Sequence, residues 1–153
     1  MVILVDTNVL LRAAKQDGSD NSIARRSLAM LHDAGHVAAI VPQSIYEYYV
    51  VATRPIESNG LGIRPGSAML GIDELLTIFR LYRDERGVFD EWRALVARFP
   101  IVGKSAHDAR IVAAMKRHGL SILLTFNVGD FTRYEADIEV LNPREVASGI
   151  VRF

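Results

Sequence analysis

The sequence predicts an α/β domain with a mostly parallel sheet, because short apolar runs alternate with helical patterns along the chain. The first strand is expected at residues 2–5 (VILV), an apolar run without polar alternation, as in a strand buried on both faces. Similar runs at 37–41, 121–125 and 138–141 are expected as further strands, and a short one at 99–102 as a fifth.

Helices are expected between these strands, where apolar residues recur at three- and four-residue spacing. Pro42 suits a first helical position, and Gly119 suits a C-cap. A last short helix opens at Asn142, an N-cap residue followed by a first-turn proline and an acid at the third position. The other helices are expected at 22–34, 42–52, 65–82, 88–98 and 106–118.

The composition fits one globular domain spanning residues 1–153, with half of the residues hydrophobic and 24% charged. Eighteen basic and eighteen acidic side chains cancel, which gives no sign of a broad nucleic-acid-binding surface but leaves room for a local basic strip. The chain has no cysteine, so disulfides and thiolate metal sites are excluded. No apolar stretch approaches the ~18 residues of a membrane span, and no signal peptide is visible, so a cytoplasmic protein is expected.

Polar side chains follow the ends of several predicted strands. Asp6 ends the first strand, Glu47 lies in the helix after the second, and Asp108 lies in the first turn of a later helix. Asn127 and Asp130 follow the third clear strand. Because the carboxyl ends of parallel strands and the helices that follow them meet at one edge of a sheet, these groups are expected to converge.

Several carboxylates in one place repel each other, and a hard divalent cation removes that conflict. Mg²⁺ prefers oxygen ligands, keeps several waters and is usually held by one or two protein carboxylates. Such an ion can activate water and stabilise the leaving oxygen in phosphodiester cleavage. No His or Cys spacing suggests zinc, and residues 60–66 do not link a strand to a helix as a glycine-rich phosphate loop would.

Each of these residues also has a simpler structural interpretation. Asp6 can cap the turn after the first strand, and Asp108 can be the third-position acid of a capping box that begins at Ser105. Glu47 can simply face solvent, and the two polar residues after the third clear strand are typical turn formers. The functional interpretation therefore depends on the combination.

Six short motifs are distributed along the chain. They are VDTNVLL at 5–11, YEYYVVATRP at 46–55, NGLG at 59–62, HDARIVAA at 107–114, LTFNVGDF at 124–131 and VLNP at 140–143. In these motifs the sequence resembles PIN-domain ribonucleases, and within them the toxin components of bacterial VapBC-type toxin–antitoxin pairs. The resemblance covers essentially the whole chain, and its specificity lies in the set of motifs together.

The resemblance implies a three-layer α/β/α sandwich with a mainly parallel sheet and the activity of a Mg²⁺- or Mn²⁺-dependent endoribonuclease. By position, Asp6, Glu47 and Asp108 correspond to three acidic residues of the family. The fourth acidic position falls at or near Asn127, where many members have aspartate, and Asp130 lies three residues further on. Asparagine offers a carbonyl oxygen but no charge, so a second metal position is in question.

A hypothesis for the chemistry follows from the residues and the resemblance together. The carboxylates of Asp6 and Asp108 hold the metal directly, while Asp130 and Glu47 act through waters or orient the attacking water. The hydroxyls of Thr7 and Thr125 resemble family positions that support the metal-binding side chains.

The resemblance also implies an RNA substrate, a cognate antitoxin protein and a homodimer. Arg12, Arg54 and Arg110 are candidates for holding the RNA backbone. The apolar and aromatic helix 43–52 and the helices within 65–98 can supply a groove or a dimer face.

Other classes of protein remain open. A metal-dependent DNase or flap-type nuclease would share the site, and an RNA-versus-DNA comparison separates it from a ribonuclease. A PIN-like binding module with weakened catalysis is favoured by Asn127, and metal titration tests it. A phosphotransfer receiver domain fits poorly, because the strand at 121–125 ends in Thr125 where a lysine is expected.

Overall fold

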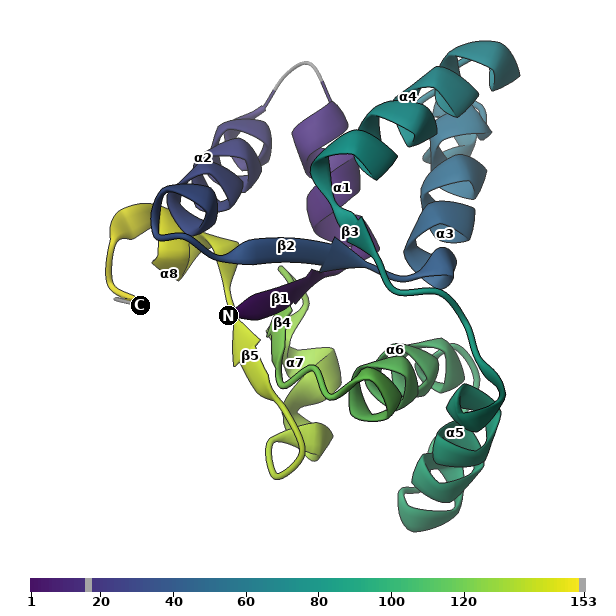
Figure 1. Cartoon of the computed structure of the whole chain (residues 1–153). Helices are drawn as coiled ribbons and strands as arrows, with labels where there is room; N and C mark the ends of the chain where they lie inside the picture. Colours follow the sequence, from purple (N-terminus) through teal and green to yellow (C-terminus); the bar gives the residue numbers. More distant parts are fainter. Residues whose placement is uncertain (16–17, 152–153) are drawn as a thin grey trace.

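A five-stranded sheet runs through the middle of the computed structural model, which describes residues 1–15 and 18–151 (Figure 1). The strand order is β3-β2-β1-β4-β5, and every neighbouring pair is parallel. The strands are β1 (Val2–Val5), β2 (Val37–Ile40), β3 (Arg80–Leu81), β4 (Ile122–Leu124) and β5 (Glu139–Leu141).

Helices cover both faces of the sheet, so the predicted three-layer α/β/α sandwich is confirmed (Figure 1). One face packs against α1 (Thr7–Ala14), α2 (Ser19–Asp33), α3 (Pro42–Thr53), α4 (Pro65–Ile78) and α8 (Pro143–Ser148). The other face packs against α5 (Arg86–Arg98), α6 (Ser105–His118) and α7 (Val128–Phe131). Two short 3₁₀ turns lie at Ile56–Ser58 and Thr132–Tyr134.

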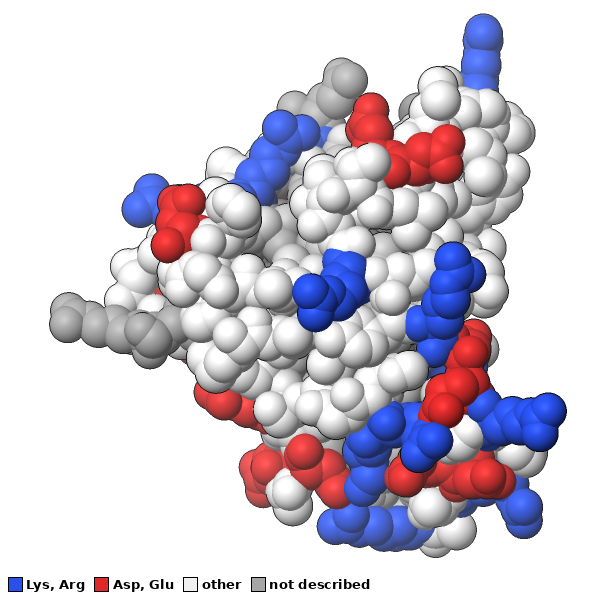
Figure 2. Space-filling view, in the orientation of Figure 1, with Lys and Arg blue, Asp and Glu red and all other residues white. Residues whose placement is uncertain are grey.

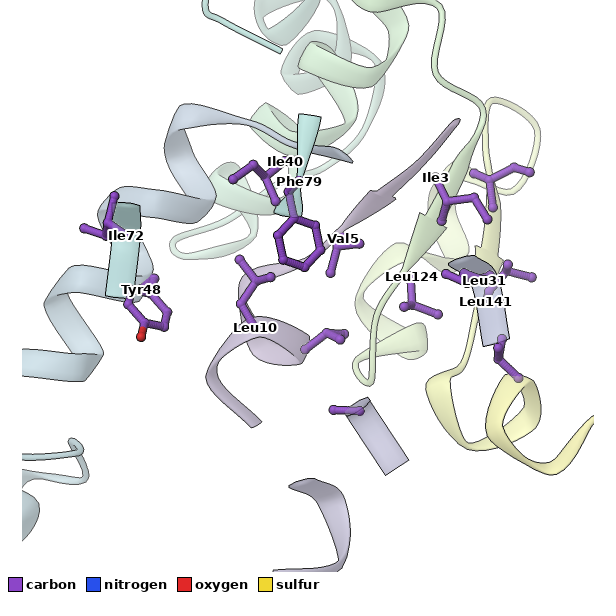
Figure 3. Packing of buried hydrophobic residues seen from close by; sticks show 14 of the residues in the cluster. Ile3, Val5, Leu10, Leu31, Ile40, Tyr48, Ile72, Phe79, Leu124 and Leu141 are labelled. Carbon is purple, nitrogen blue, oxygen red and sulfur yellow. The ribbon is translucent and has the colours of Figure 1, made fainter. Parts of the chain in front are cut away.

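Successive residues of the central strands enter opposite cores, as the two-residue period of a strand requires. Ile3 and Val5 pack on the α1–α4 side, whereas Leu4 between them packs on the α5–α6 side. Figure 3 shows Val5 close to Leu10 of α1 and to Phe79 in the first of these cores. The continuous apolar run at residues 2–5 is therefore explained by burial on both faces.

The predicted strands at 2–5, 37–41, 121–125 and 138–141 are confirmed, but the one at 99–102 is wrong. That segment lies within the described residues and forms a turn and a loop, in which Val102 is 82% exposed. Its proline lacks the N–H that a strand needs for its hydrogen bonds.

The predicted helix 65–82 ends earlier than its apolar spacing indicates. α4 stops at Ile78, Phe79 becomes extended, and Arg80 and Leu81 form the edge strand β3 beside β2. The short helices α1 and α7 were not predicted. The capping box at Ser105 is also wrong, because Lys104 is the N-cap residue of α6 and Ser105 is already helical.

Charged side chains of both signs are mixed on the surface. On the face in Figure 2, Lys and Arg lie among Asp and Glu, most densely around α5, and no broad basic surface forms there. Among the described residues, no helix is long and apolar enough to cross a membrane.

Candidate functional site

A pocket of about 420 Å³ opens at the carboxyl ends of the strands. Its polar lining includes Asp6 at the end of β1, Glu47 of α3, Asp108 of α6 and Asn127 after β4. The structure therefore brings four of the five predicted site residues together. The other lining residues are mostly apolar, namely Leu11, Tyr46, Val50, Val51 and Ile111, with Thr7, Asn8 and Arg54.

Asp6 is the most deeply placed of these acids, with 7% of its surface exposed. Its Oδ2 accepts hydrogen bonds from Thr125 Oγ1 at 2.6 Å and from Asn8 Nδ2 at 2.5 Å. Burial, and to a lesser extent the nearby charges of Glu47 and Asp108, raises the pKa of Asp6 to about 6 against the opposing effect of the Thr125 hydrogen bond. Asp6 is also the N-cap residue of α1, but without a side-chain capping hydrogen bond, so the simpler capping interpretation does not account for its contacts.

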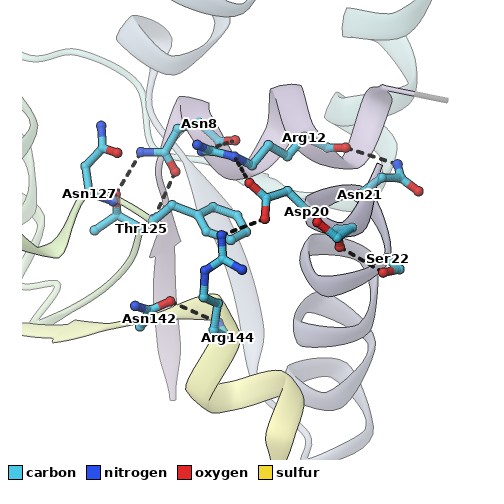
Figure 4. Close-up of polar contacts among 11 residues, drawn as sticks. Asn8, Arg12, Asp20, Asn21, Ser22, Thr125, Asn127, Asn142 and Arg144 are labelled. Carbon is cyan, nitrogen blue, oxygen red and sulfur yellow. Dashed lines mark hydrogen bonds and ion pairs between the residues drawn. The ribbon is translucent and has the colours of Figure 1, made fainter. Parts of the chain in front are cut away.

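Thr125 connects the two segments that surround Asp6. Its fully buried hydroxyl donates to Asp6 and accepts from Asn8 Nδ2 at 2.8 Å and from the backbone N–H of Asn127 at 3.1 Å. A hydroxyl has one donor and two acceptor positions, and all three are used here. The Asn8 carbonyl oxygen in turn accepts from the backbone N–H of Phe126 at 3.1 Å. Figure 4 shows Asn8 and Asn127 on either side of Thr125. This network fixes the Asp6 carboxylate in one orientation.

Glu47 does not simply face solvent, because each of its oxygens accepts a side-chain hydrogen bond. Thr7 Oγ1 donates to Oε2 at 2.9 Å, and Gln43 Nε2 donates to Oε1 at 2.7 Å. Gln43 also donates to the main-chain oxygen of His107 at 3.0 Å, which connects α3 to the start of α6. Thr7 and Thr125 thus each orient one carboxylate of the pocket.

Asp108 lies half-buried in the first turn of α6, as predicted. Burial raises its pKa, and the charges of Asp130 and then Glu47 raise it further. Asp130 is therefore near enough to influence the site electrostatically, but it is exposed on α7 and does not line the pocket. Asn127 lines the pocket from an exposed position.

The donor set suits a hydrated divalent cation better than a closed protein cage. In residues 1–15 and 18–151, no three His, Cys, Asp or Glu side chains lie close enough to hold a metal by themselves. The pocket instead offers carboxylate oxygens whose mutual repulsion a cation would relieve. Mg²⁺ matches this arrangement, because it keeps several waters and uses one or two protein carboxylates.

Two side chains of the site, Asn8 and Gln43, were not predicted. Gln43 lies four residues before Glu47, so the helical spacing could have indicated the contact. Asn8 lies two residues after Asp6, but nothing in the spacing indicates that it reaches the segment after β4. Of the predicted RNA-binding arginines, Arg54 lines the pocket, whereas Arg12 and Arg110 form ion pairs with acidic neighbours.

The chain belongs to the PIN domain family, whose family model matches residues 3–136. Its structure is similar to VapBC2 from Rickettsia felis, solved bound to a promoter DNA fragment, with a TM-score of 0.71, 15% identity and coverage of 93% of this chain and 98% of that one. It is similar to VapBC-1 from nontypeable Haemophilus influenzae, with a TM-score of 0.69, 14% identity and coverage of 94% and 98%.

A third similar structure is the Sarcin-Ricin loop cleaving toxin VapC20 from Mycobacterium tuberculosis, with a TM-score of 0.62, 15% identity and coverage of 85% and 95%. At these identities the likeness is one of fold. A comparison with curated protein sequences found no match.

Proposed function

We propose that this PIN domain is a divalent-metal-dependent endoribonuclease and the toxin of a type II toxin–antitoxin pair. The observation that carries the proposal is the convergence of Asp6, Glu47 and Asp108, from three separate elements, on one pocket at the sheet edge. The names of the similar structures support it, because two are VapBC structures and a third is described as a Sarcin-Ricin loop cleaving toxin.

A divalent ion bound in the pocket would supply an attacking water of lowered pKa and offset the negative charge that develops on the phosphate. Asp6 and Asp108 are the proposed direct ligands. Both oxygens of Glu47 already accept hydrogen bonds, which suits a role through a water, and Asp130 is proposed to act in the same way from α7. Thr125 and Asn8 keep the Asp6 carboxylate oriented, and Thr7 does the same for Glu47.

The proposal includes two protein partners. One is a cognate antitoxin, supported by a similar structure from Klebsiella pneumoniae that is described as a toxin–antitoxin complex. The other is a second copy of this chain. Apolar side chains on α4 support such an interface, since Leu70 and Ile78 are 66% and 69% exposed.

The test is cleavage of a labelled RNA pool with Mg²⁺, with Mn²⁺ and with EDTA, using the wild type beside Asp6→Asn. Asp33→Asn, which removes an exposed carboxylate at the end of α2, is the matched control. The proposal expects metal-dependent cleavage by the wild type and by Asp33→Asn, and none by Asp6→Asn. Cleavage in EDTA, or full activity of Asp6→Asn, would contradict it, and preferential cleavage of a DNA pool would assign the site to a DNase instead.

A further inference from the structure

Two arginines from opposite parts of the sequence lie over one aromatic ring beside the pocket. The guanidinium carbon of Arg12 in α1 lies 4.3 Å from the centroid of the Phe126 ring, and that of Arg144 in α8 lies 5.5 Å from it. Asp20 of α2 binds both arginines, through Oδ2 to Arg12 Nε at 3.0 Å and through Oδ1 to Arg144 Nη2 at 2.7 Å (Figure 4). We call these four residues the arginine cluster.

The arginine cluster is connected directly to the hydrogen bonds that hold Asp6. Phe126 follows Thr125, and its backbone N–H donates to Asn8 Oδ1. Arg12 lies one helical turn after Asn8, and its Nη1 is 3.4 Å from the main-chain oxygen of Asn8. α1 and α8 follow the carboxyl ends of β1 and β5, so the cluster lies on the same edge of the sheet as the pocket.

The charges of the cluster do not cancel. Two guanidinium groups share one carboxylate, which leaves one positive charge next to a pocket lined by three carboxylates. Each guanidinium has five N–H donors, and the contacts described above use two in Arg12 and one in Arg144. The side chains are 34% and 53% exposed, so donors remain within reach of a ligand.

We propose that the arginine cluster is a binding subsite for an RNA backbone phosphate next to the one that is cleaved. A phosphate oxyanion fits two guanidinium groups in the way that the Asp20 carboxylate does, and arginine is well suited to such paired hydrogen bonds. Phe126 holds both guanidinium groups in place through cation–π contacts. This inference rests on the proposed function, and it adds Asp20 as an internal competitor for the incoming phosphate.

A purely structural role would explain the same contacts differently, because the cluster also joins α8 to α1 and α2. The structural role and the phosphate-binding role predict opposite changes in RNA binding when Asp20 is lost. If the cluster only joins helices, loss of Asp20 and loss of Arg144 both weaken the protein and any binding to it. If the cluster binds phosphate, loss of Arg144 weakens RNA binding, whereas loss of Asp20 strengthens it.

The test is binding of a short fluorescein-labelled RNA pool of random sequence, measured by fluorescence anisotropy in EDTA over a range of KCl concentrations. Arg144→Gln is expected to weaken binding several-fold and to reduce the slope of log K against log [salt] by about 0.7, the value for one contact to a single strand. Asp20→Asn is expected to tighten binding several-fold. The matched controls, Arg93→Gln on α5 and Asp33→Asn on α2, are expected to change binding little.

Several outcomes would overturn the subsite. They are absence of binding by the wild type, changes no larger than those of the controls, and weaker binding in both Asp20→Asn and Arg144→Gln. The same anisotropy measurement with fluorescein-labelled polyglutamate tests an acidic protein segment as the ligand. If Arg144→Gln loses polyglutamate binding but binds RNA unchanged, the cluster binds such a segment instead. If Arg144→Gln fails to fold, Arg144→Lys is expected to keep the salt slope but to bind more weakly.

Failure of the subsite is distinguishable from failure of the proposed nuclease activity. Binding in EDTA does not require metal, whereas the cleavage assay with Asp6→Asn does. A wild type that cleaves RNA with metal while its Arg144 and Asp20 variants bind RNA like the controls would retain the nuclease and reject the subsite.

Discussion

The inner part of the candidate site is Asp6 with its hydrogen-bond partners Thr125 and Asn8, and the outer part is the exposed pair Asn127 and Asp130. The two parts are held in different ways. Asp6 is buried, its carboxylate accepts two side-chain hydrogen bonds, and its pKa is raised to about 6. Asn127 and Asp130 are exposed, and they belong to the four-residue helix α7 or its N-cap. A carboxylate that is buried despite its charge is fixed by the fold, whereas an exposed one at a helix start is equally suited to a turn. We therefore expect the inner part to carry the chemistry and the outer part to adjust it.

The largest expected difference between the two parts is in activity. Asp6→Asn removes a charge that the pocket cannot replace, and it is expected to lower RNA cleavage by more than about a hundredfold, beyond the usual effect of a supporting residue. Asp130→Asn is expected to lower it by no more than about tenfold. Single-turnover cleavage rates at saturating Mg²⁺ measure the effect of each substitution. Equal losses of rate in Asp6→Asn and Asp130→Asn would contradict the different roles of the inner and outer parts.

The next difference concerns stability in the absence of metal. The pKa of Asp6 is about 6 in the folded protein against an ordinary value of 3.8, so the folded state binds more protons between these values. Its contribution to the free energy of unfolding is therefore fully present below about pH 4 and lost as the pH rises through 6, by about 2–3 kcal/mol in total. Asp6→Asn is expected to lack this loss.

Urea unfolding in EDTA at pH 4.5 and pH 8 checks this expectation, with the stability difference between wild type and Asp6→Asn as the readout. That difference is expected to shift in favour of the variant at the higher pH, by about 2 kcal/mol. Asp130→Asn serves as the control from the outer part. If the free energy of unfolding depended on pH in the same way in the wild type and in Asp6→Asn, the raised pKa of Asp6 in the folded protein would be contradicted.

A third contrast compares two threonines. Thr125→Val removes one of the two donors to Asp6, one of the two acceptors of Asn8 Nδ2 and the acceptor of the Asn127 N–H. It is expected to destabilise the protein by about 1–3 kcal/mol. Thr125→Ser is expected to retain most of the stability. Thr132→Val, just after α7, loses an exposed hydrogen bond to the Gly129 carbonyl and is expected to change the stability by less than about 0.5 kcal/mol. Thermal unfolding compares the stability of these three variants with that of the wild type. A similar loss of stability in Thr125→Val and Thr132→Val would contradict the expected difference between the two threonines.

The smallest effect is expected from restoring an acid at the outer position. Asn127→Asp adds a fourth carboxylate to the pocket lining, and it is expected to raise Mn²⁺ affinity by only a few-fold, because the position is exposed and its charge is screened. Calorimetric titration measures this change. A gain of a hundredfold or more would mean that the outer position is as important for metal binding as Asp6.

Sequence patterns were sufficient for four of the five strands and for the edge at which the polar groups meet. The apolar runs at 2–5 and 121–125 predict two buried strands, which the structure places side by side, and the acids at strand ends and helix starts then converge. What depends on tertiary packing was not predictable, such as the end of α4 at Ile78 and the edge strand that follows it. Spacing along the chain also cannot indicate that Asn8 bonds to Thr125, or that Asp130 lies outside the pocket.

The proposed function depends most on the metal-binding role of the buried Asp6 carboxylate. Calorimetric titration of Mn²⁺ into the wild type and into Asp6→Asn, both folded and at neutral pH, tests it directly. We expect a saturable binding event in the wild type that is absent in Asp6→Asn and retained in Asp130→Asn. Equal Mn²⁺ binding by the wild type and Asp6→Asn, or none by either, would contradict the assignment of this pocket as a metal site.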